Sequence, residues 1–163
     1  MLQAGLQKLV ERLFSEALAV YGERLVSLAV FGSVGRGTPG FDSDLDFLVI
    51  ARDLPAGRMK RIREFDLVEE RLAPFIDSLK REGIDTSLSP IIKSPEEASL
   101  GSPLFLDMVE DARILFDADG FFAGILARLN GRLKELGSRR VRLGNAWYWV
   151  LKPDFKAGEV FEI

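Results

Sequence analysis

Two short apolar runs enclose a glycine-rich stretch in the first third of this 163-residue chain, and this unit constrains the fold most. Residues 25–31 (LVSLAVF) and 45–50 (LDFLVI) are mostly apolar, which is typical of buried strands. The intervening residues 32–43 (GSVGRGTPGFDS) are rich in Gly, Ser and Pro, which predicts a loop, with or without one helical turn. We therefore expect a strand, a loop and a second strand to follow one another here.

Apolar residues recur at helical spacing on both sides of this unit. Their positions predict a first helix over 2–21 and a second over 58–82, which Pro74 is expected to bend. Gly83 is expected to end the second helix, and residues 84–92 (IDTSLSPII) indicate a third strand.

The rest of the chain predicts short helices and a β-hairpin. Ser94-Pro95 and Ser102-Pro103 are typical helix starts, and Asp119 is expected to cap a helix that ends near residue 136. Residues 114–116 indicate a short strand. The last predicted elements are strands over 141–143 and 147–151, joined by a turn at Gly144-Asn145.

The element order indicates an α/β (α+β) fold, in which helices flank a small mixed sheet. A chain of this length is expected to form one compact unit. We expect residues 1–93 to form the core, and residues 94–163 to form a C-terminal helical and β-hairpin extension that packs on it.

The chain contains no His and no Cys, which excludes several classes of chemistry. There can be no disulfide, thiol nucleophile, Cys-ligated zinc or iron–sulfur site, and no catalysis by imidazole. Any chemistry must use carboxylates, hydroxyls, Lys, Arg, Tyr or backbone amides. A bound metal must be a hard, oxygen-ligated cation such as Mg²⁺.

Two acidic residues lie where the glycine-rich loop enters the second strand. Strand alternation places Asp44 and Asp46 on one face, and carboxylates this close repel one another unless a cation lies between them. At the start of the loop, Gly32 and Ser33 offer backbone amides and a hydroxyl to an anion. The pattern predicts a polyphosphate-binding loop beside a divalent-metal site. The alternative is a glycine-rich connection followed by solvated acids.

The same stretch resembles the nucleotidyltransferase superfamily related to DNA polymerase beta, and especially its minimal, antitoxin-type branch. The family pattern is Gly-Ser, ten residues, then Asp-x-Asp, and ten residues separate Ser33 from Asp44 here. The apolar strands on either side also match. The resemblance covers residues 25–92 and the helix before them.

The resemblance implies a role for each residue of the motif. Gly32 and Ser33 would bind the tail of a nucleoside triphosphate, and Asp44 and Asp46 would hold two Mg²⁺ ions. Arg36 lies inside the loop, where it would contact phosphate or face solvent.

The family pattern also includes a third carboxylate on a later strand, and Asp85 is the best candidate. It would be a metal ligand and the general base for the acceptor hydroxyl. Asp85 lies at the very start of its predicted strand, so the alternative is a residue of the preceding turn. A register shifted by two or four residues would instead place Ser87 or Ser89 at the third position.

The implied function is Mg²⁺-dependent transfer of a nucleoside monophosphate from a triphosphate, ATP in the first instance, to a hydroxyl acceptor. In antitoxin-type members the acceptor is a HEPN-like helical partner protein, and a partner Tyr is our preferred acceptor. The alternative is a catalytically inactive nucleotide- or partner-binding module of the same fold, which an absent third carboxylate would favour.

The C-terminal tail mixes basic and aromatic residues. Arg139, Arg140, Trp147 and Trp149 could bind single-stranded nucleic acid, but packing on the domain or on a partner is the preferred interpretation. The slightly acidic net charge of −3 gives no general attraction to nucleic acid. No secretory signal or membrane-spanning stretch is recognised, so a cytoplasmic protein without membrane association is expected.

Overall fold

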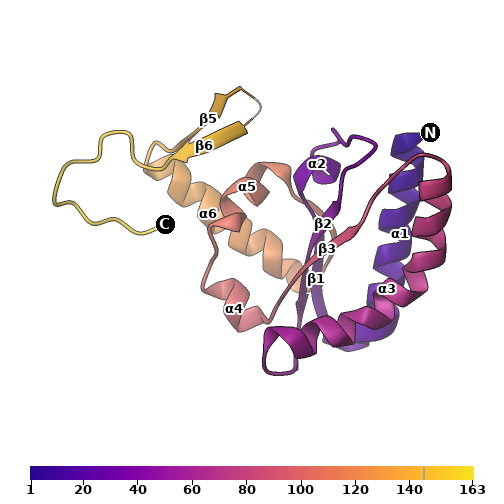
Figure 1. Ribbon diagram of the computed structural model, residues 1–163. Helices are drawn as coiled ribbons and strands as arrows, with labels where there is room; N and C mark the ends of the chain where they lie inside the picture. The colour runs from indigo at the N-terminus through magenta and orange to yellow at the C-terminus, as the bar shows by residue number, and fades with distance from the viewer. Residues whose placement is uncertain (145) are drawn as a thin grey trace.

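A four-stranded sheet forms the centre of the computed structural model, which describes residues 1–144 and 146–163 (Figure 1). The strand order is β3-β2-β1-β4. The strands are β1 (Leu25–Val30), β2 (Leu45–Ala51), β3 (Leu88–Lys93) and β4 (Arg113–Asp117). Strand β1 is antiparallel to both β2 and β4, whereas β2 and β3 are parallel. The mixed sheet expected from the sequence is confirmed.

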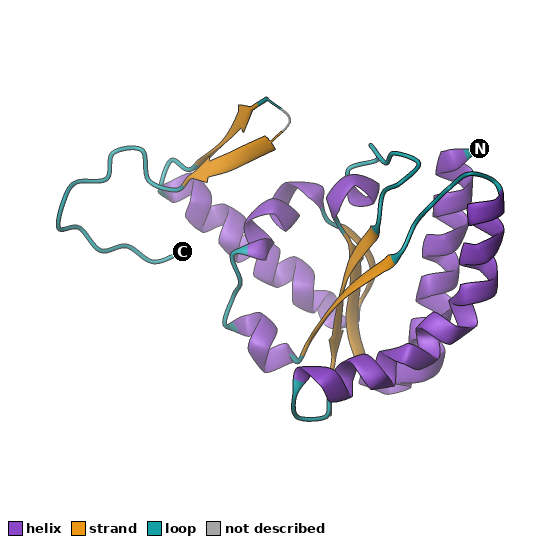
Figure 2. Cartoon of the chain, viewed as in Figure 1, coloured by secondary structure: helices purple, strands orange, loops and turns teal. Residues whose placement is uncertain are grey.

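Helices cover both faces of this sheet (Figure 2). On one face lie α1 (Leu2–Tyr21) and α3 (Arg58–Arg81). On the other lie α4 (Pro95–Ser99), α5 (Leu104–Asp111) and α6 (Phe121–Glu135). One further helical turn, α2 (Gly32–Gly35), lies in the glycine-rich loop, and the 3-10 turns η1 (Gly22–Arg24) and η2 (Ala118–Gly120) precede β1 and α6.

Side-chain alternation along β2 divides the core into two parts. Phe47 and Val49 pack toward α1 and α3, whereas Leu48 and Ile50 pack toward α4, α5 and α6. All four are fully buried, and a shift of one residue would exchange the two faces, so the register is strongly determined. Asp46 belongs to the same face as Leu48 and Ile50. It therefore lies on the α5 side of the sheet.

The C-terminal residues contribute to more than one part of the fold. Strand β4 pairs with β1 in the central sheet, while β5 (Arg139–Leu143) and β6 (Ala146–Val150) form a separate antiparallel hairpin. Part of the segment 94–163 thus completes the sheet begun by residues 1–93. A division after residue 93 remains a proposal. Of the predicted Gly144-Asn145 turn, Asn145 lies outside the described residues.

Strand β3 begins later than the sequence pattern indicated. Its pairing with β2 starts at Leu45↔Leu88, because β2 itself begins there and offers no earlier partner. The preceding residues bind the glycine-rich loop instead: Asp85 N–H donates to the Phe41 carbonyl at 2.7 Å, and Thr86 Oγ1 donates to the Ser43 carbonyl at 2.8 Å. Asp85 therefore precedes the strand.

The N-cap position of α6 is Gly120, and the side chain that accepts from its first N–H groups is Asp117 rather than Asp119, which the sequence pattern favoured. The Asp117 carboxylate accepts hydrogen bonds from the backbone N–H groups of Phe122 and Ala123, both at 2.9 Å, and from Ser27 Oγ at 2.5 Å. Asp119 instead occupies the left-handed region, at φ 54°, within η2. The expectation for Asp119 was wrong because the chain makes an extra turn before the helix begins.

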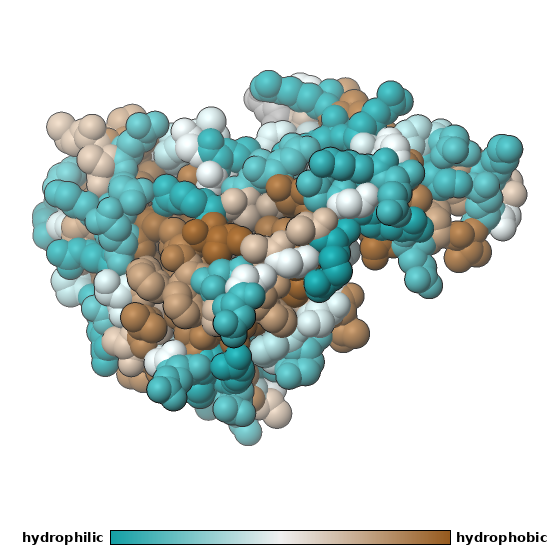
Figure 3. Space-filling model, turned by 180° about the vertical axis from the view of Figure 1, so that it is seen from behind, coloured by the Kyte–Doolittle hydropathy of each residue, from teal (hydrophilic) through white to brown (hydrophobic). Residues whose placement is uncertain are grey.

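An apolar patch lies on the rear face of the molecule, and hydrophilic residues surround it (Figure 3). Strand β4 is the edge strand opposite β3, and its Ile114, Leu115 and Phe116 are only half-buried. The register between β1 and β4 is interrupted at Leu28/Ala29, an irregularity that discourages pairing with a further strand.

No helix within the described residues is both long and apolar enough to span a membrane.

Replacing Asp117 by Asn is expected to destabilise the protein by about 1–2 kcal/mol, because it removes a charged acceptor of two helix N–H groups. The matched change Asp119→Asn removes the same charge two residues away and is expected to alter the free energy of unfolding by less than about 0.5 kcal/mol. Urea unfolding of the two variants measures both effects. Equal stabilities would contradict the assignment of Asp117 as the cap.

Candidate functional site

The glycine-rich loop begins as a single helical turn directly after β1. Phe31 N–H donates to the Asp46 carbonyl at 3.0 Å, which fixes the start of the turn against β2. The turn is closed by hydrogen bonds from Gly35 N–H to the Phe31 carbonyl and from Arg36 N–H to the Gly32 carbonyl, at 3.0 and 3.1 Å. The N–H groups of the first residues of such a turn have no partner within it. They are available to an anion.

Two glycines allow this turn to sit where it does. Gly32 has φ 65°, and a Cβ there would lie against Asp46 Oδ2. At Gly35 a Cβ would lie 2.6 Å from the Asp111 carbonyl oxygen and 3.0 Å from that of Val30. Only glycine fits either position, so the turn approaches both the Asp46 carboxylate and the end of α5 as closely as backbone can.

Asp46 lies beside the turn and Asp44 lies near Asp46, and each has a serine next to it: Ser89 of β3 beside Asp46, and Ser87, which directly precedes β3, beside Asp44. Asp44 is exposed and accepts a 2.5 Å hydrogen bond from Ser87 Oγ. Asp46 is half-buried and is paired in register with Ser89, whose side chain lowers the pKa of its carboxylate. The structure therefore places Asp46 against Gly32 and close to Asp44, while the roles of these residues stay a prediction.

The pKa of Asp46 is raised above its ordinary value. Burial is the main cause, and the charge of Asp44 adds to it, whereas the Ser89 hydrogen bond and the charge of Arg36 lower the pKa. A carboxylate with this balance is stabilised by an added cation. Two acidic oxygen donors at the start of an inner strand suit a hard divalent ion, so Asp44 and Asp46 fit Mg²⁺.

Asp85 is not brought to this pair. Its side chain is 70% exposed and forms an ion pair with Lys80, with Oδ1 and Nζ 3.2 Å apart. In the described residues, no three His, Cys, Asp or Glu side chains are grouped so that they could hold a metal. The positions next to Asp44 and Asp46 belong to Ser87 and Ser89, the register that the sequence left open. The role of Asp85 as third ligand and base stays a prediction.

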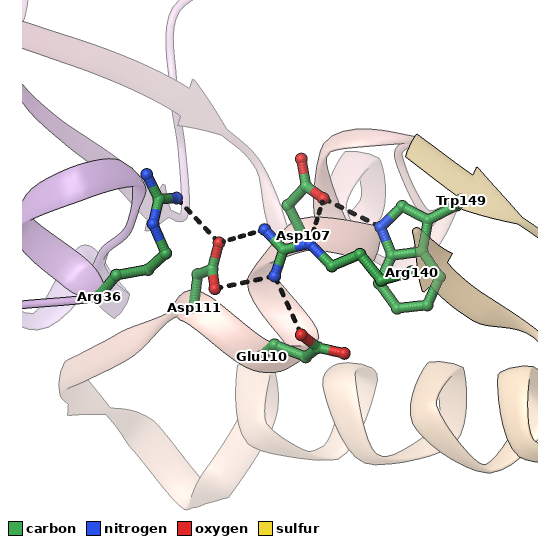
Figure 4. A network of polar contacts seen from close by, with 6 residues as sticks. All are labelled: Arg36, Asp107, Glu110, Asp111, Arg140 and Trp149. Atoms are coloured by element: carbon green, nitrogen blue, oxygen red, sulfur yellow. Dashed lines mark hydrogen bonds and ion pairs between the residues drawn. The ribbon is translucent and has the colours of Figure 1, made fainter. Parts of the chain in front are cut away.

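Arg36 has partners that its position in the loop did not reveal (Figure 4). Its Nη1 donates to Asp111 Oδ2 at 3.0 Å, and its guanidinium lies 4.5 Å from the ring centre of Trp147. Asp111 also accepts from Arg140 of β5, at 3.1 Å on Oδ1 and 2.8 Å on Oδ2. Arg140 stacks on the Trp147 ring at 3.9 Å. Two arginines from distant segments thus share one carboxylate and one indole.

Burial raises the pKa of Asp111, but the hydrogen bonds from Arg140 and Arg36 outweigh it and hold the pKa below its ordinary value. Sequence reasoning missed Asp111, because an acid at the end of a short helix has no motif around it. The alternation of Arg and Trp in the hairpin was the available signal. Arg140, Trp147 and Trp149 contact the domain itself: Trp149 Nε1 donates to Asp107 at 2.9 Å. This agrees with packing rather than nucleic-acid binding.

A hollow of about 440 Å³ lies beside the loop, between α1 and the residues that follow α2. Its lining includes Gln3, Gln7, Gly37 and Arg113, which offer both hydrogen-bond donors and acceptors. A second groove of about 500 Å³, between the α4–α5 connection and α6, shares no residue with the loop or the acid pair. The first hollow borders the loop through Val34, Gly37 and Pro39, but none of Gly32, Ser33, Asp44 and Asp46 lines it.

Comparison with known sequences agrees with this geometry. The family model described as "Nucleotidyltransferase domain" matches residues 10–116, which include the turn, both acids and β4 except its last residue. A protein of Methanocaldococcus jannaschii, provisionally named a protein adenylyltransferase, is 31% identical over 134 residues, which cover 80% of this chain and 85% of that protein.

Solved structures with related folds are more distant. A toxin–antitoxin complex with AMP-PNP contains a chain that is 18% identical, with a TM-score of 0.43, over 84% of this chain and 94% of that one. In a complex of a tri-AMPylated Shewanella oneidensis HEPN toxin with an MNT antitoxin, the values are 16% and 0.40, over 84% and 93%. TM-scores below 0.5 carry no inference about activity or partners.

Replacing Asp46 by Asn is expected to raise the Tm of the metal-free protein. Because burial raises the pKa of Asp46, the ionised form costs stability at neutral pH, and Asn removes the charge. Mg²⁺ should raise the Tm of the unaltered protein but not that of the variant. Asp42→Asn, a change to an exposed acid of the same loop, serves as control and should keep the Mg²⁺ response. An Mg²⁺ response retained in Asp46→Asn would contradict the assignment.

Proposed function

The chain belongs to the nucleotidyltransferase domain family, and from this premise we propose that it transfers AMP from ATP to a hydroxyl group of a partner protein. Membership makes it a nucleotidyltransferase enzyme. The observation that carries the proposal is the close approach of the Gly32 turn to the carboxylate of Asp46, with Asp44 beside it. The name of the archaeal relative supports AMP as the transferred group and a protein as the acceptor.

In this proposal the turn binds the triphosphate. The first N–H groups of α2 and the hydroxyl of Ser33 would donate to phosphate oxygens, since the Ser33 hydroxyl makes no hydrogen bond to other described residues. Gly32 keeps the backbone free of a side chain at the closest point. Arg36 would add a charged donor, because only its Nη1 is hydrogen-bonded within the described residues.

Asp44 and Asp46 would hold Mg²⁺, which when bound neutralises the triphosphate and assists the departure of pyrophosphate. The acceptor oxygen forms a bond to the α-phosphorus, the bond from that phosphorus to the bridging oxygen of the β-phosphate breaks, and the hydroxyl proton passes to a base. Asp85 is the predicted base. It would have to leave Lys80 to act.

We further infer from the antitoxin-type resemblance that the acceptor is a Tyr of a HEPN-like helical partner. A second candidate function is nucleotide or partner binding without turnover. One observation favours it: Ser87 and Ser89, rather than an acid, lie next to Asp44 and Asp46 on β3 and its preceding residue. Serine cannot accept a proton at neutral pH as a carboxylate can.

Replacing Asp44 and Asp46 together by Ala is expected to weaken Mg²⁺-dependent ATP binding at least about 100-fold, because both proposed metal ligands are lost. Titration calorimetry with and without Mg²⁺ measures the affinity. Asp42→Ala removes an exposed acid two residues before Asp44 and should bind as the unaltered protein does. Full Mg²⁺-dependent binding in the double variant would refute the proposed site.

Asp85→Ala separates the two candidate functions. If Asp85 is the base, the variant should bind MgATP normally and lose pyrophosphate release and AMP transfer to the partner, measured by intact-protein mass spectrometry. The binding module would be supported if the unaltered protein binds MgATP tightly but shows no turnover toward a helical partner or other hydroxyl acceptors. In that case Asp85→Ala should leave MgATP binding unchanged.

A further inference from the structure

The C-terminal hairpin rests on α5 by one of its two faces. Arg140 and Trp149 are cross-strand partners, as are Arg142 and Trp147, and partners directly opposite one another share a face. From this face Arg140 reaches Glu110 at 2.9 Å and Asp111 at 2.8 Å, while Trp149 reaches Asp107 (Figure 4). The hairpin therefore contacts α5 at the end that lies against the glycine turn.

Asp111 is the point at which the two meet. It is the last residue of α5, and its side chain is only 6% exposed. A carboxylate at a helix C-terminus is unfavourable next to the helix dipole, and a buried carboxylate needs a compensating charge. Asp111 has two, Arg36 and Arg140, and its own carbonyl oxygen faces Gly35 of the turn.

The two arginines differ in how much of their charge is neutralised by Asp111, as their contacts show. Arg140, with a side chain 13% exposed, covers both oxygens of Asp111, so this pair is largely neutral. Arg36 makes one hydrogen bond to Asp111 and is 29% exposed. Its backbone N–H closes the glycine turn on the Gly32 carbonyl at 3.1 Å, so its side chain begins beside the proposed phosphate site. Without Arg140, Asp111 would neutralise Arg36 instead.

We propose that the C-terminal hairpin, through Arg140, Trp147 and Asp111, positions Arg36 as a cationic ligand for the polyphosphate and preserves its charge for that ligand. Trp147 fixes the plane of the guanidinium by stacking, and Asp111 holds one N–H. The remaining donors point to no other group of the described residues. Arg140, Trp147 and Asp111 are positioning residues that touch no substrate. This inference rests on the proposed function of the site.

Arg140→Gln tests the inference by titration of the full-length protein with MgATP. The dissociation constant for MgATP is expected to rise about tenfold, because Asp111 loses the charge of Arg140 and neutralises Arg36 instead. KM for ATP should rise, with kcat nearly unchanged. Arg139→Gln removes the same charge from the neighbouring position, which is exposed, and should stay within about twofold of the unaltered protein. Equal affinity of Arg140→Gln and unaltered protein would overturn the proposal.

A double-variant comparison separates positioning from mere docking of the hairpin. If Arg140 acts through Arg36, then Arg36→Ala/Arg140→Gln should bind MgATP no more weakly than Arg36→Ala alone. Additive losses would overturn the proposal. Arg140→Lys retains the charge without the paired hydrogen bonds and should recover most of the affinity. This control covers the case in which Arg140→Gln perturbs folding. Failure of Arg140→Lys to recover affinity, in a variant with unchanged Tm, would contradict the electrostatic role.

Inorganic tripolyphosphate distinguishes failure of this inference from failure of the proposed function. In one outcome the protein binds tripolyphosphate but not MgATP, and both Arg36→Ala and Arg140→Gln weaken the binding of tripolyphosphate. The positioning of Arg36 is then supported, and the proposed AMP transfer is refuted. If MgATP binding requires Asp44 and Asp46 but is insensitive to Arg140→Gln, the opposite holds. Absence of binding to either probe would overturn both.

Discussion

The contact between the Gly32 backbone and the Asp46 carboxylate determines the geometry of the site. Antiparallel pairing of β1 and β2 brings the end of one strand to the start of the other, and Phe31 N–H is fixed to the Asp46 carbonyl. Because β2 is buried on both faces, its register cannot slip without exposing one core. The same packing that stabilises the sheet therefore holds a carboxylate against a turn of free N–H groups.

Charges of alternating sign extend from this contact to the C-terminal hairpin. The acids Asp44 and Asp46 are followed by Arg36, then by Asp111 and finally by Arg140. From Asp46 onward each charge is adjacent to one of opposite sign, which lowers the cost of burying the inner members. A segment more than a hundred residues away in sequence is thereby coupled to the turn. This explains why an otherwise separate two-stranded sheet carries two arginines and two tryptophans on one face.

The structural features that could be predicted from the sequence are those that depend on residues close together in the chain. The spacing from Gly32 to Asp46 and the alternation along β2 are local, so the turn and the acid pair followed from them. The start of β3 depends on where β2 begins, and this long-range pairing placed Ser87 and Ser89, not Asp85, beside the acids. The Arg36–Asp111 pair spans 75 residues, and no local pattern could indicate it.

Binding of a divalent ion by Asp44 and Asp46 at the glycine turn can be observed by anomalous diffraction from crystals grown with Mn²⁺ and a non-hydrolysable ATP analogue. We expect a metal peak about 2.0–2.3 Å from carboxylate oxygens of both Asp44 and Asp46, with phosphate oxygens against the N–H groups of Gly32 and Ser33. A metal held without either carboxylate, or a triphosphate seated away from the turn, would contradict it.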